Sequence, residues 1–333
     1  MALFGDNISF RIARSSVSHP QTGRGLKRRL VLPVGDLIGE FRYASPTTME
    51  EACDMLEKHG QEAKLLAGGQ SLVLLMKMGL VNPKLVIDIK RIPGLSDIRV
   101  EDDASDGKRV TVGALATHAQ VHSSPLLRAW APVLVEATGS IGHPQIRNRG
   151  TLGGSLSHSD PAANLGAAVL ALKAKMVAVS SGGRRRAIEA ESFFRGPFST
   201  ALQETEILEK VQFAAQGRMV GYSFKKFALT HGDFPVATAC AMISTEERRC
   251  AEAVIAVGGV AEKPFRARQT EDFLKGEGKT DDATIARASE LIVRESESGG
   301  MPVSEFKRKI LKAMARRALT TAVDRAEGAR DAI

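Results

Sequence analysis

Cysteine and the large aromatic residues are scarce in this chain of 333 residues, which has three cysteines, one tryptophan and two tyrosines. Cys53, Cys240 and Cys250 lie far apart and form no CxxC pair, which is typical of a reducing compartment. Three cysteines cannot supply the four thiolates of an iron–sulfur cluster. Few aromatic side chains are available to stack on nucleic-acid bases. No apolar run approaches the roughly 20 residues of a membrane-spanning helix.

Positive charge is in excess, with a net charge of +8 and a pI near 9.5. Much of it lies at the two ends: residues 1–35 hold six Lys or Arg and one acidic residue. Basic ends exposed to water explain this best, and nucleic-acid binding is the alternative. We expect no nucleic-acid partner and no membrane span. The seven histidines show no HExxH or clustered Cys/His pattern, so we expect no metal site.

The length predicts two or three domains. Residues 1–40 lack periodicity and an apolar signal segment, and we expect a disordered extension. We predict a first domain over 41–216, with lobes at about 41–95 and 96–216, a second domain over 217–327 and a tail over 328–333. The fold class is α+β, because a small βαβ lobe and a larger α+β lobe precede three antiparallel strands and a helix bundle.

The small lobe has clear boundary signals. Thr47 followed by Glu50 predicts a capping box, and Gly60 predicts the end of the helix. A buried strand should then end at Gly68-Gly69, a short helix should follow, and "KLVIDI" should be a further strand.

Farther along, "PLLRAWAPVLVEATGSIG" predicts one helix with an apolar stripe that ends at Gly139. A long polar loop follows, and loops of this kind are often functional. We interpret Arg184-Arg185-Arg186 as a solvated hairpin. Strands are expected in 219–229, 236–245 and 251–260, and helices over 281–295 and 304–326.

Two glycine turns stand out, "LLAGGQSLVLL" at 65–75 and "GTLGGS" at 150–155. A pyrophosphate needs hydrogen-bond donors, and amides at a glycine turn before a helix provide them without side-chain bulk. Neither turn has the Rossmann or P-loop pattern. Each alone is best explained as a tight turn. Together, with open amides and a hydroxyl residue at each, they predict a dinucleotide held between them.

Neighbouring side chains leave some alternatives. Ser155, His158 and Asp160 lie within one hexapeptide, so they cannot easily form a hydrolase triad, and no G-x-S-x-G elbow is present. His118 and His143 are interpreted as turn or helix-end residues, and His143 could also flank a cofactor. Arg147 and Arg149 either are solvated or bridge domains, or else orient the loop or a diphosphate.

Three stretches, "LLAGGQSLVLLMK", "VGALATHAQV" and "IGHPQIRNRGTLGGSLSHSDPAANL", resemble the FAD-binding medium subunit of molybdenum hydroxylases. That family includes xanthine dehydrogenase, aerobic carbon monoxide dehydrogenase and bacterial N-heterocycle dehydrogenases. The resemblance runs from about Phe41 to Ala326. It implies a two-lobed PCMH-type FAD-binding domain followed by a C-terminal flavoprotein domain with a three-stranded antiparallel sheet and a helix bundle.

The resemblance implies FAD contacts from five segments. Both glycine turns would wrap the pyrophosphate, Thr117 would lie beside the cofactor, and the loop 157–164 would follow the ribityl chain. "FKKFALTHGDF" resembles the stretch that brings a Lys and an Asp to the isoalloxazine. The implied cofactor-binding residues are Leu66, Ala67, Gly68, Gly69, Gln70, Ser71, Leu72, Ala114, Thr117, Thr151, Leu152, Gly153, Gly154, Ser155, His158, Asp160, Asn164, Lys226 and Asp233.

This chain departs from the family pattern at a few places. Gln70 stands where some relatives carry His, and Asn164 where an acidic residue is common. Leu229 and Thr230 stand where an Arg is common. The pyrophosphate site therefore follows the family more closely than the ring environment does.

The resemblance further implies an electron-transfer role. Electrons from two [2Fe-2S] clusters in a small subunit would reach FAD in this chain and then quinone, oxygen or NAD. Molybdopterin would belong to a large subunit, the complex would be a dimer of heterotrimers (a heterohexamer), and no catalytic acid–base residue is expected here. We expect a cytoplasmic protein that could reach a membrane through its complex. A stand-alone FAD-dependent oxidoreductase is the alternative, and the substrate cannot be read from this chain.

Overall fold

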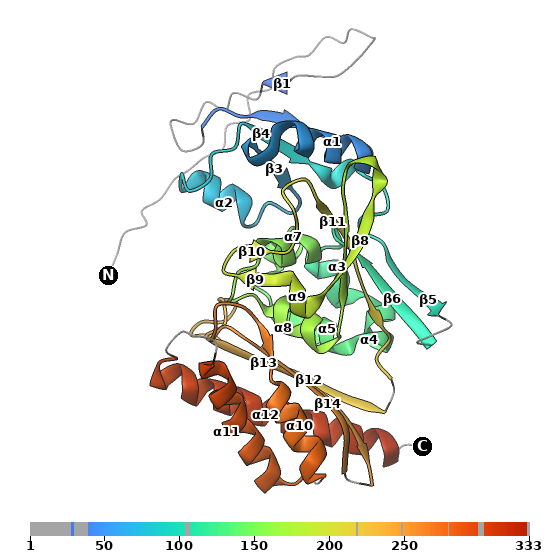
Figure 1. Ribbon diagram of the computed structural model, residues 1–333, viewed down its shortest axis with the longest axis vertical. Coiled ribbons are helices and arrows are strands. Elements are labelled where there is room, and N and C mark those ends of the chain that lie inside the picture. The colour runs from blue at the N-terminus through green and yellow to red at the C-terminus, as the bar shows by residue number, and fades with distance from the viewer. Residues whose placement is uncertain are drawn as a thin grey trace.

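In the described residues, three larger β-sheets follow one another along the long axis of the molecule, each accompanied by helices from its own part of the chain (Figure 1). A fourth sheet has only two strands. The structure is a computed structural model. It describes residues 28–29, 39–103, 107–217, 219–247, 249–278, 280–298 and 303–331. The predicted disordered extension therefore lies almost entirely outside the described residues.

The small lobe at the N-terminal end is a parallel βαβ unit, as predicted. Its strands lie in the order β1-β2-β4-β3, and β4 pairs in parallel with both β2 and β3. Parallel neighbours require a crossover, which here contains α2. The elements are β1 (Arg28–Arg29), β2 (Arg42–Ala44), α1 (Met49–His59), β3 (Ala63–Leu66), α2 (Leu72–Lys77) and β4 (Leu85–Asp88).

The N-terminus of α1 is shifted by one residue from the prediction. Thr48, not Thr47, is the N-cap, and its side chain accepts from the Glu51 amide. The Glu51 carboxylate in turn accepts from the Thr47 amide at 3.0 Å. Adjacent threonines and adjacent glutamates made both registers possible. Gly60 ends the helix with φ of 50°, as predicted.

The middle domain contains a five-stranded antiparallel sheet in the order β5-β6-β11-β7-β8. Seven helices and a small hairpin complete it. The five strands of the sheet are β5 (Ile98–Asp103), β6 (Gly107–Gly113), β7 (Lys175–Val179), β8 (Arg185–Glu189) and β11 (Ile207–Ala214). The hairpin consists of β9 (Phe194–Gly196) and β10 (Ser199–Thr200). The helices are α3 (His118–Ser123), α4 (Pro125–Trp130), α5 (Pro132–Gly139), α6 (Pro144–Arg147), α7 (Leu152–His158), α8 (Asn164–Ala171) and α9 (Ala190–Phe193).

The single helix predicted over 125–139 is two helices, α4 and α5. Ala131 separates them in a non-helical conformation, and Pro132 begins α5. Proline has no amide hydrogen for the preceding turn and disfavours helical geometry in the residue before it. The apolar stripe hid this break, because it continues across both helices.

The arginine run at 184–186 is exposed and belongs to the β7–β8 hairpin, as predicted, but two of its side chains also form ion pairs that the sequence did not indicate. Arg185 makes two hydrogen bonds to Glu209, at 2.9 and 2.8 Å. Arg186 makes two to Glu206, at 2.6 and 2.7 Å, and Glu206 is buried. The Arg186 guanidinium holds the pKa of the Glu206 carboxyl below its usual range. These pairs join β8 to Glu209 of β11 and to Glu206, the residue directly before β11.

The C-terminal domain has four antiparallel strands rather than three, in the order β12-β13-β14-β15. The sequence missed the short β15 and also α10, while α12 continues into the predicted tail. The elements are β12 (Val220–Phe227), β13 (Ala237–Glu246), β14 (Arg249–Gly258), β15 (Phe265–Arg266), α10 (Arg268–Glu277), α11 (Asp282–Glu297) and α12 (Glu305–Asp331).

This last sheet is buried on both faces. Along β13, Ala239, Ala241 and Ile243 pack in the core formed with the helices α10 to α12. Cys240 points the other way, into the core shared with α5 and α8 of the middle domain. Alternation with a period of two along a strand produces this division. The middle domain and the C-terminal domain therefore share one hydrophobic core.

Candidate functional site

The first glycine turn leads from β3 into α2. Gly69 has a φ of 78°, a conformation that glycine adopts without strain. Among the described residues, no backbone or side-chain acceptor takes the four consecutive amides of residues 68–71. Ser71 precedes α2, and its side chain makes no capping hydrogen bond. The turn therefore presents a row of hydrogen-bond donors, as the sequence predicted.

The second glycine turn differs from the prediction, because its amides are already bonded. Leu152 and Gly153 donate to the carbonyls of Ala116 and Ala114, at 2.9 and 2.8 Å. Gly154 donates to the Thr151 hydroxyl at 3.1 Å, and Ser155 to the Thr151 carbonyl at 3.0 Å. Pairing with the segment 114–117, which sequence reasoning did not foresee, engages the amides of Leu152 and Gly153, and Thr151 engages the other two. The second turn therefore has a structural role and does not offer free backbone amides to a ligand.

The two turns touch. A Cβ placed on Gly68 would come within 2.0 Å of the Arg149 carbonyl oxygen and 2.9 Å of the Gly150 Cα. A Cβ on Gly154 would lie 3.6 Å from the Ala67 Cβ. Only glycine at 68 permits this approach of the two backbones. The open amides of the first turn therefore lie directly beside the second turn, which fits an elongated phosphate-bearing group.

The segment "GALATHAQV" packs against the second turn. Thr117 forms an antiparallel bridge with Thr151, and its side chain caps α3 by accepting from the Gln120 amide at 3.1 Å. A Cβ on Gly153 would come within 2.5 Å of the Ala114 Cβ. Ala114, Thr117 and the second turn are thus brought together, as the predicted site requires.

His118 is buried at the same place. Its amide donates to the Gly150 carbonyl at 2.9 Å, and a Cβ on Gly150 would come within 2.8 Å of its ring. Its Nδ1 has no hydrogen-bond partner in the described part of the chain. Burial, with a smaller contribution from the charge of Arg147, lowers the pKa of His118 to about 4. The imidazole is therefore neutral at physiological pH.

Three residues predicted to lie near the flavin ring are linked through one that the sequence missed, Ser140. Asn164 Nδ2 donates to the Ser140 hydroxyl at 3.0 Å and to the Ala137 carbonyl at 3.1 Å. Lys226 Nζ donates to the Ser140 carbonyl at 2.8 Å and to the Asp233 carbonyl at 2.7 Å. Lys226 uses the backbone carbonyl of Ser140. Every residue has such a carbonyl, so nothing in the sequence singles out Ser140.

His158 and Asp160 lie at the C-terminal end of α7. The His158 ring is half-buried, 5.1 Å from the Phe198 ring, and burial lowers its pKa. The Asp160 carboxylate accepts from the Ala162 amide at 2.8 Å and so shapes the loop. Phe198, which sequence reasoning missed, is exposed and has a φ of 55°. Its amide donates to Ser159, which also has a positive φ.

The loop 140–150 joins these two parts of the site. Arg147 donates to the carbonyls of Ile141 and Gly142, at 2.9 and 3.0 Å, so it orients the loop. The Arg149 side chain is exposed, and its backbone contacts Gly68. His143 is the N-cap of α6, and its ring lies against Gly232 of the C-terminal domain. Of the alternatives for Arg147, orientation of the loop is the one that the geometry supports.

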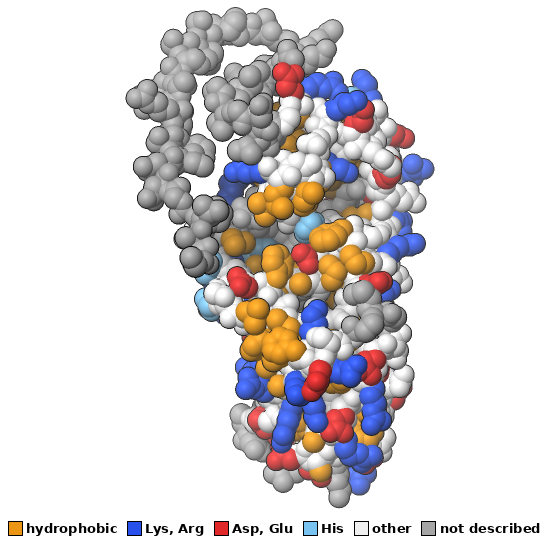
Figure 2. Space-filling view, turned by 90° about the vertical axis from the view of Figure 1, so that its left-hand side faces the viewer, with side chains coloured by type: hydrophobic (Ala, Val, Ile, Leu, Met, Phe, Trp, Pro, Cys, Tyr) orange, Lys and Arg blue, Asp and Glu red, His pale blue; other side chains and the backbone are white. Residues whose placement is uncertain are grey.

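Hydrophobic side chains gather over the middle of the face that carries α2 and the β9–β10 hairpin (Figure 2). Figure 2 also shows a hollow there, with a histidine at its edge. The most exposed large hydrophobic residues include several from the site segments: Leu74, Met78, Leu80, Phe198, Leu229 and Phe234. Such patches mark binding surfaces more often than ordinary exposed surface does.

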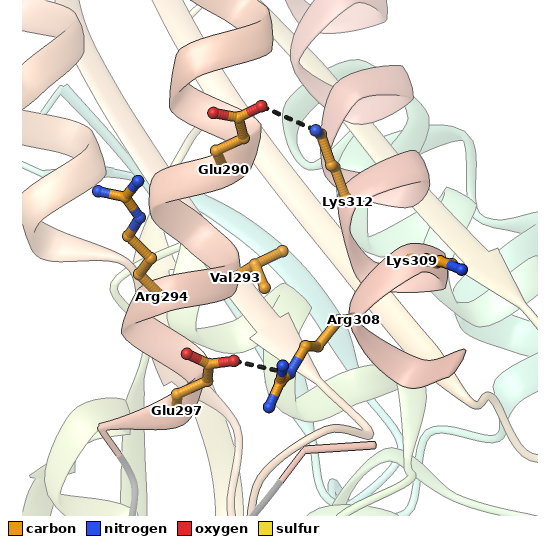
Figure 3. Close-up of a pocket in the computed structure, with 7 residues that line it drawn as sticks. All are labelled: Glu290, Val293, Arg294, Glu297, Arg308, Lys309 and Lys312. Carbon is orange, nitrogen blue, oxygen red and sulfur yellow. Dashed lines mark hydrogen bonds and ion pairs between the residues drawn. The ribbon is translucent and has the colours of Figure 1, made fainter. Parts of the chain in front are cut away.

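A separate pocket of about 320 Å³ lies between α11 and α12, far along the chain from the glycine turns (Figure 3). Val293 lies between the helices, and opposite charges pair across it. Lys312 bonds Glu290 at 2.8 Å and Arg308 bonds Glu297 at 2.7 Å. Because these facing charges are paired with each other, we interpret the pocket as part of the packing interface between α11 and α12 and not as a ligand site. In the described residues, no three His, Cys, Asp or Glu side chains form a metal-binding group.

Comparison with known proteins agrees with this geometry. Residues 39–214 match a family described as the FAD binding domain in molybdopterin dehydrogenase. Residues 222–322 match one described as the CO dehydrogenase flavoprotein C-terminal domain. The chain belongs to the family of FAD-binding medium subunits of molybdenum hydroxylases. It is an oxidoreductase subunit with an FAD-binding domain.

Individual relatives cover most of the chain. The nicotine 6-hydroxylase medium subunit of Paenarthrobacter nicotinovorans is 42% identical over 71% of this chain and 80% of its own length. The caffeine dehydrogenase subunit beta of Pseudomonas sp. (strain CBB1) is 34% identical over 86% of this chain and 95% of its own. A solved chain of carbon monoxide dehydrogenase from Hydrogenophaga pseudoflava superimposes with a TM-score of 0.79. That chain is 32% identical, and the match covers 86% of this chain and 98% of that one.

Proposed function

We propose that this chain is the FAD-binding electron-transfer subunit of a heterotrimeric molybdenum-containing hydroxylase or dehydrogenase. It would receive electrons from [2Fe-2S] clusters of a small subunit and deliver them to an external acceptor. The observation that carries the proposal is the row of open amides at residues 68–71, pressed against the second turn through Gly68. Backbone amides at such a turn favour a diphosphate.

The protein groups would divide the work as follows. The amides of the first turn hydrogen-bond phosphate oxygens, while the second turn and Thr151 hold the opposite wall in place. When bound, FAD supplies the chemistry of accepting and releasing electrons. The residues of this chain bind and orient it, and no acid–base pair is required of them. We assign Gln70, Ser155, His158 and Asp160 to the cofactor surface for the same reason, since they lie on or beside these two segments.

The partners are part of the same proposal. Relatives named for nicotine, caffeine and carbon monoxide are similar in sequence to most of this chain. Such similarity across relatives with different named substrates favours substrate binding in another subunit, here a large one that carries molybdopterin. We propose a cytoplasmic dimer of heterotrimers, with quinone, oxygen or NAD as acceptor. No helix in the described part of the chain is long and apolar enough to cross a membrane.

The test is a titration of the full chain with FAD, alone and in the complex purified through an affinity tag on this chain. We expect stoichiometric FAD with its visible absorption band, together with one iron–sulfur chain and one molybdenum-bearing chain. Failure to bind FAD in both forms would refute the cofactor assignment. Unaided turnover of a small substrate by the chain, without companion chains, would instead support a stand-alone FAD oxidoreductase.

A further inference from the structure

The bonds around Ser140 connect segments that are distant in sequence. Ser140 follows α5 in the middle domain, while Lys226 lies in β12 of the C-terminal domain. Lys226 Nζ bonds the Ser140 carbonyl at 2.8 Å and the Asp233 carbonyl at 2.7 Å. One ammonium group therefore holds two backbone segments, one from each domain.

The segment that Lys226 reaches is the loop 228–236 between β12 and β13. Leu229 is 76% exposed and Phe234 is 66% exposed, so their side chains contribute little anchoring. Within the loop, the Asp233 amide bonds the Thr230 carbonyl at 3.2 Å, and at its end Val236 bonds Phe227 at 2.8 Å. Segments with few buried apolar contacts open locally at low free-energy cost. Pro235 is buried at the end of the loop, whereas no side chain of residues 229–234 is buried. The two bonds of Lys226 are therefore a large share of what fixes residues 229–234.

Lysine suits this task chemically. Its ammonium has three donor hydrogens and accepts nothing, so it can serve two carbonyls at once. The group is half-buried, and burial lowers its pKa while the nearby Asp233 carboxylate opposes that effect. The hydrogen bond to Asp233 goes to the backbone carbonyl, so it depends on where the loop lies rather than on the Asp233 side chain.

We propose that Lys226 is a positioning residue that fastens the loop 228–236 to the end of α5. The loop lies against the same turn region that continues to Gly150 and the second glycine turn, because the His143 ring packs on Gly232. Fastening the loop therefore fixes the protein surroundings of the flavin ring end. That last step rests on the proposed function, whereas the fastening itself does not.

The direct test is hydrogen exchange of the loop in the full chain. Lys226→Met removes all donors but keeps the stem, and we expect amide exchange in 228–236 to rise at least tenfold. Lys226→Arg should restore part of the protection, because a guanidinium can still donate to carbonyls. Lys225→Met is the matched control. Lys225 directly precedes Lys226 in β12, and its side chain points to the other face of the sheet. Unchanged exchange in both Lys226 variants would overturn the proposal.

Two further variants separate the backbone acceptor from the side chains around it. Ser140→Ala keeps the carbonyl that Lys226 uses, so protection of the loop should stay within about twofold of the unchanged protein. Asn164→Ala likewise leaves the two lysine bonds in place. Loss of loop protection in these variants but not in Lys226→Met would assign the fastening to the Asn164–Ser140 bond and contradict the role of Lys226.

The consequence for the cofactor is measured in the FAD-loaded complex. Lys226→Met should still bind FAD but shift the flavin midpoint potential, and Lys226→Arg should return it toward the original value. A changed exchange rate with an unchanged potential would confine Lys226 to the loop and refute its effect on the flavin. Absence of FAD from the unchanged complex would refute the proposed function, and the exchange result would stand without it.

Discussion

The two glycine turns look alike in sequence and play different parts in the structure. In the first, the amides of residues 68–71 have no acceptor among the described residues. In the second, residues 152–155 donate to Ala114, Ala116 and Thr151. The first turn is a donor surface, whereas the second is a rigid support. A Gly-Gly pair followed by a hydroxyl residue therefore does not by itself identify a phosphate-binding turn.

The difference follows from the neighbours of each turn. The second turn is paired with residues 114–117, which accept from two of its amides, and Thr151 accepts from the other two and caps α7. In the described part of the chain nothing comparable pairs with the first turn, and the Ser71 side chain makes no capping hydrogen bond to α2. We therefore expect the affinity for FAD to depend on the first turn, and the free energy of unfolding to depend on the second. Four substitutions test this division.

The largest effect is expected for Gly68→Ala. The added methyl would meet the Arg149 carbonyl oxygen at 2.0 Å, so the two backbones must separate. We expect FAD affinity to fall about a thousandfold, or about 4 kcal/mol, measured by titration. Gly276→Ala, where a Cβ meets nothing within 4 Å, is the matched control and should leave affinity unchanged. Near-normal binding by Gly68→Ala would show that the turns need not touch.

His118 provides a pH-dependent test of the support behind the second turn. Its pKa falls from 6.5 to about 4 on folding, so the unfolded chain binds the proton more tightly. The free energy of unfolding should therefore drop as pH falls from about 6.5 to about 4, by up to about 3 kcal/mol from this group. Denaturant unfolding of the unchanged protein and of His118→Gln at pH 7 and pH 4 measures the difference.

His59, which is partly exposed in the small lobe, is the control substitution for that experiment. His118→Gln should flatten the pH dependence more than His59→Gln does. Equal slopes in all three proteins would contradict the buried, neutral state of His118.

Thr151→Val removes the hydroxyl that accepts from the Gly154 amide. Loss of such a cap costs about 1 kcal/mol of stability, and thermal unfolding measures it. FAD affinity should fall by less than in Gly68→Ala, because the amides of the first turn remain. An unchanged unfolding temperature would show that the second turn is held by its pairing with 114–117 alone.

Ser71→Ala should have the smallest effect on stability, under about 0.5 kcal/mol, because its side chain caps nothing. Any effect should appear in FAD binding instead, as a loss of less than tenfold. A larger loss of stability than in Thr151→Val would reverse the roles assigned to the two turns.

The sequence predicted the parts of the fold that depend on local pattern. The βαβ lobe, the three long C-terminal strands and the stop at Gly60 follow from periodicity and turn residues. The break at Ala131 is encoded locally by Pro132, but the continuous apolar stripe concealed it. The pairs of Arg185 and Arg186 depend on tertiary contacts, and β15 is very short. Periodicity carries little information about these.

The candidate site divides in the same way. Gly68 and Gly69 were recognisable because a side chain is absent where two backbones meet. The closed amides of the second turn and the carbonyl of Ser140 were not, because backbone acceptors are the same in every residue. The roles of the predicted cofactor-binding residues toward FAD, including those of Asp160, Asn164 and Asp233, stay predictions.

The double-sided burial of the C-terminal sheet has a practical consequence for expression. The first family match ends at residue 214 and the second begins at residue 222. The gap between them suggests a boundary at which the chain could be divided into two fragments. Yet Phe224, Cys240 and Val254 pack in the same core as α5 and α8. A fragment that stops at residue 216 would present that apolar surface to water, and we expect it to aggregate. Useful truncations should instead retain the chain through α12.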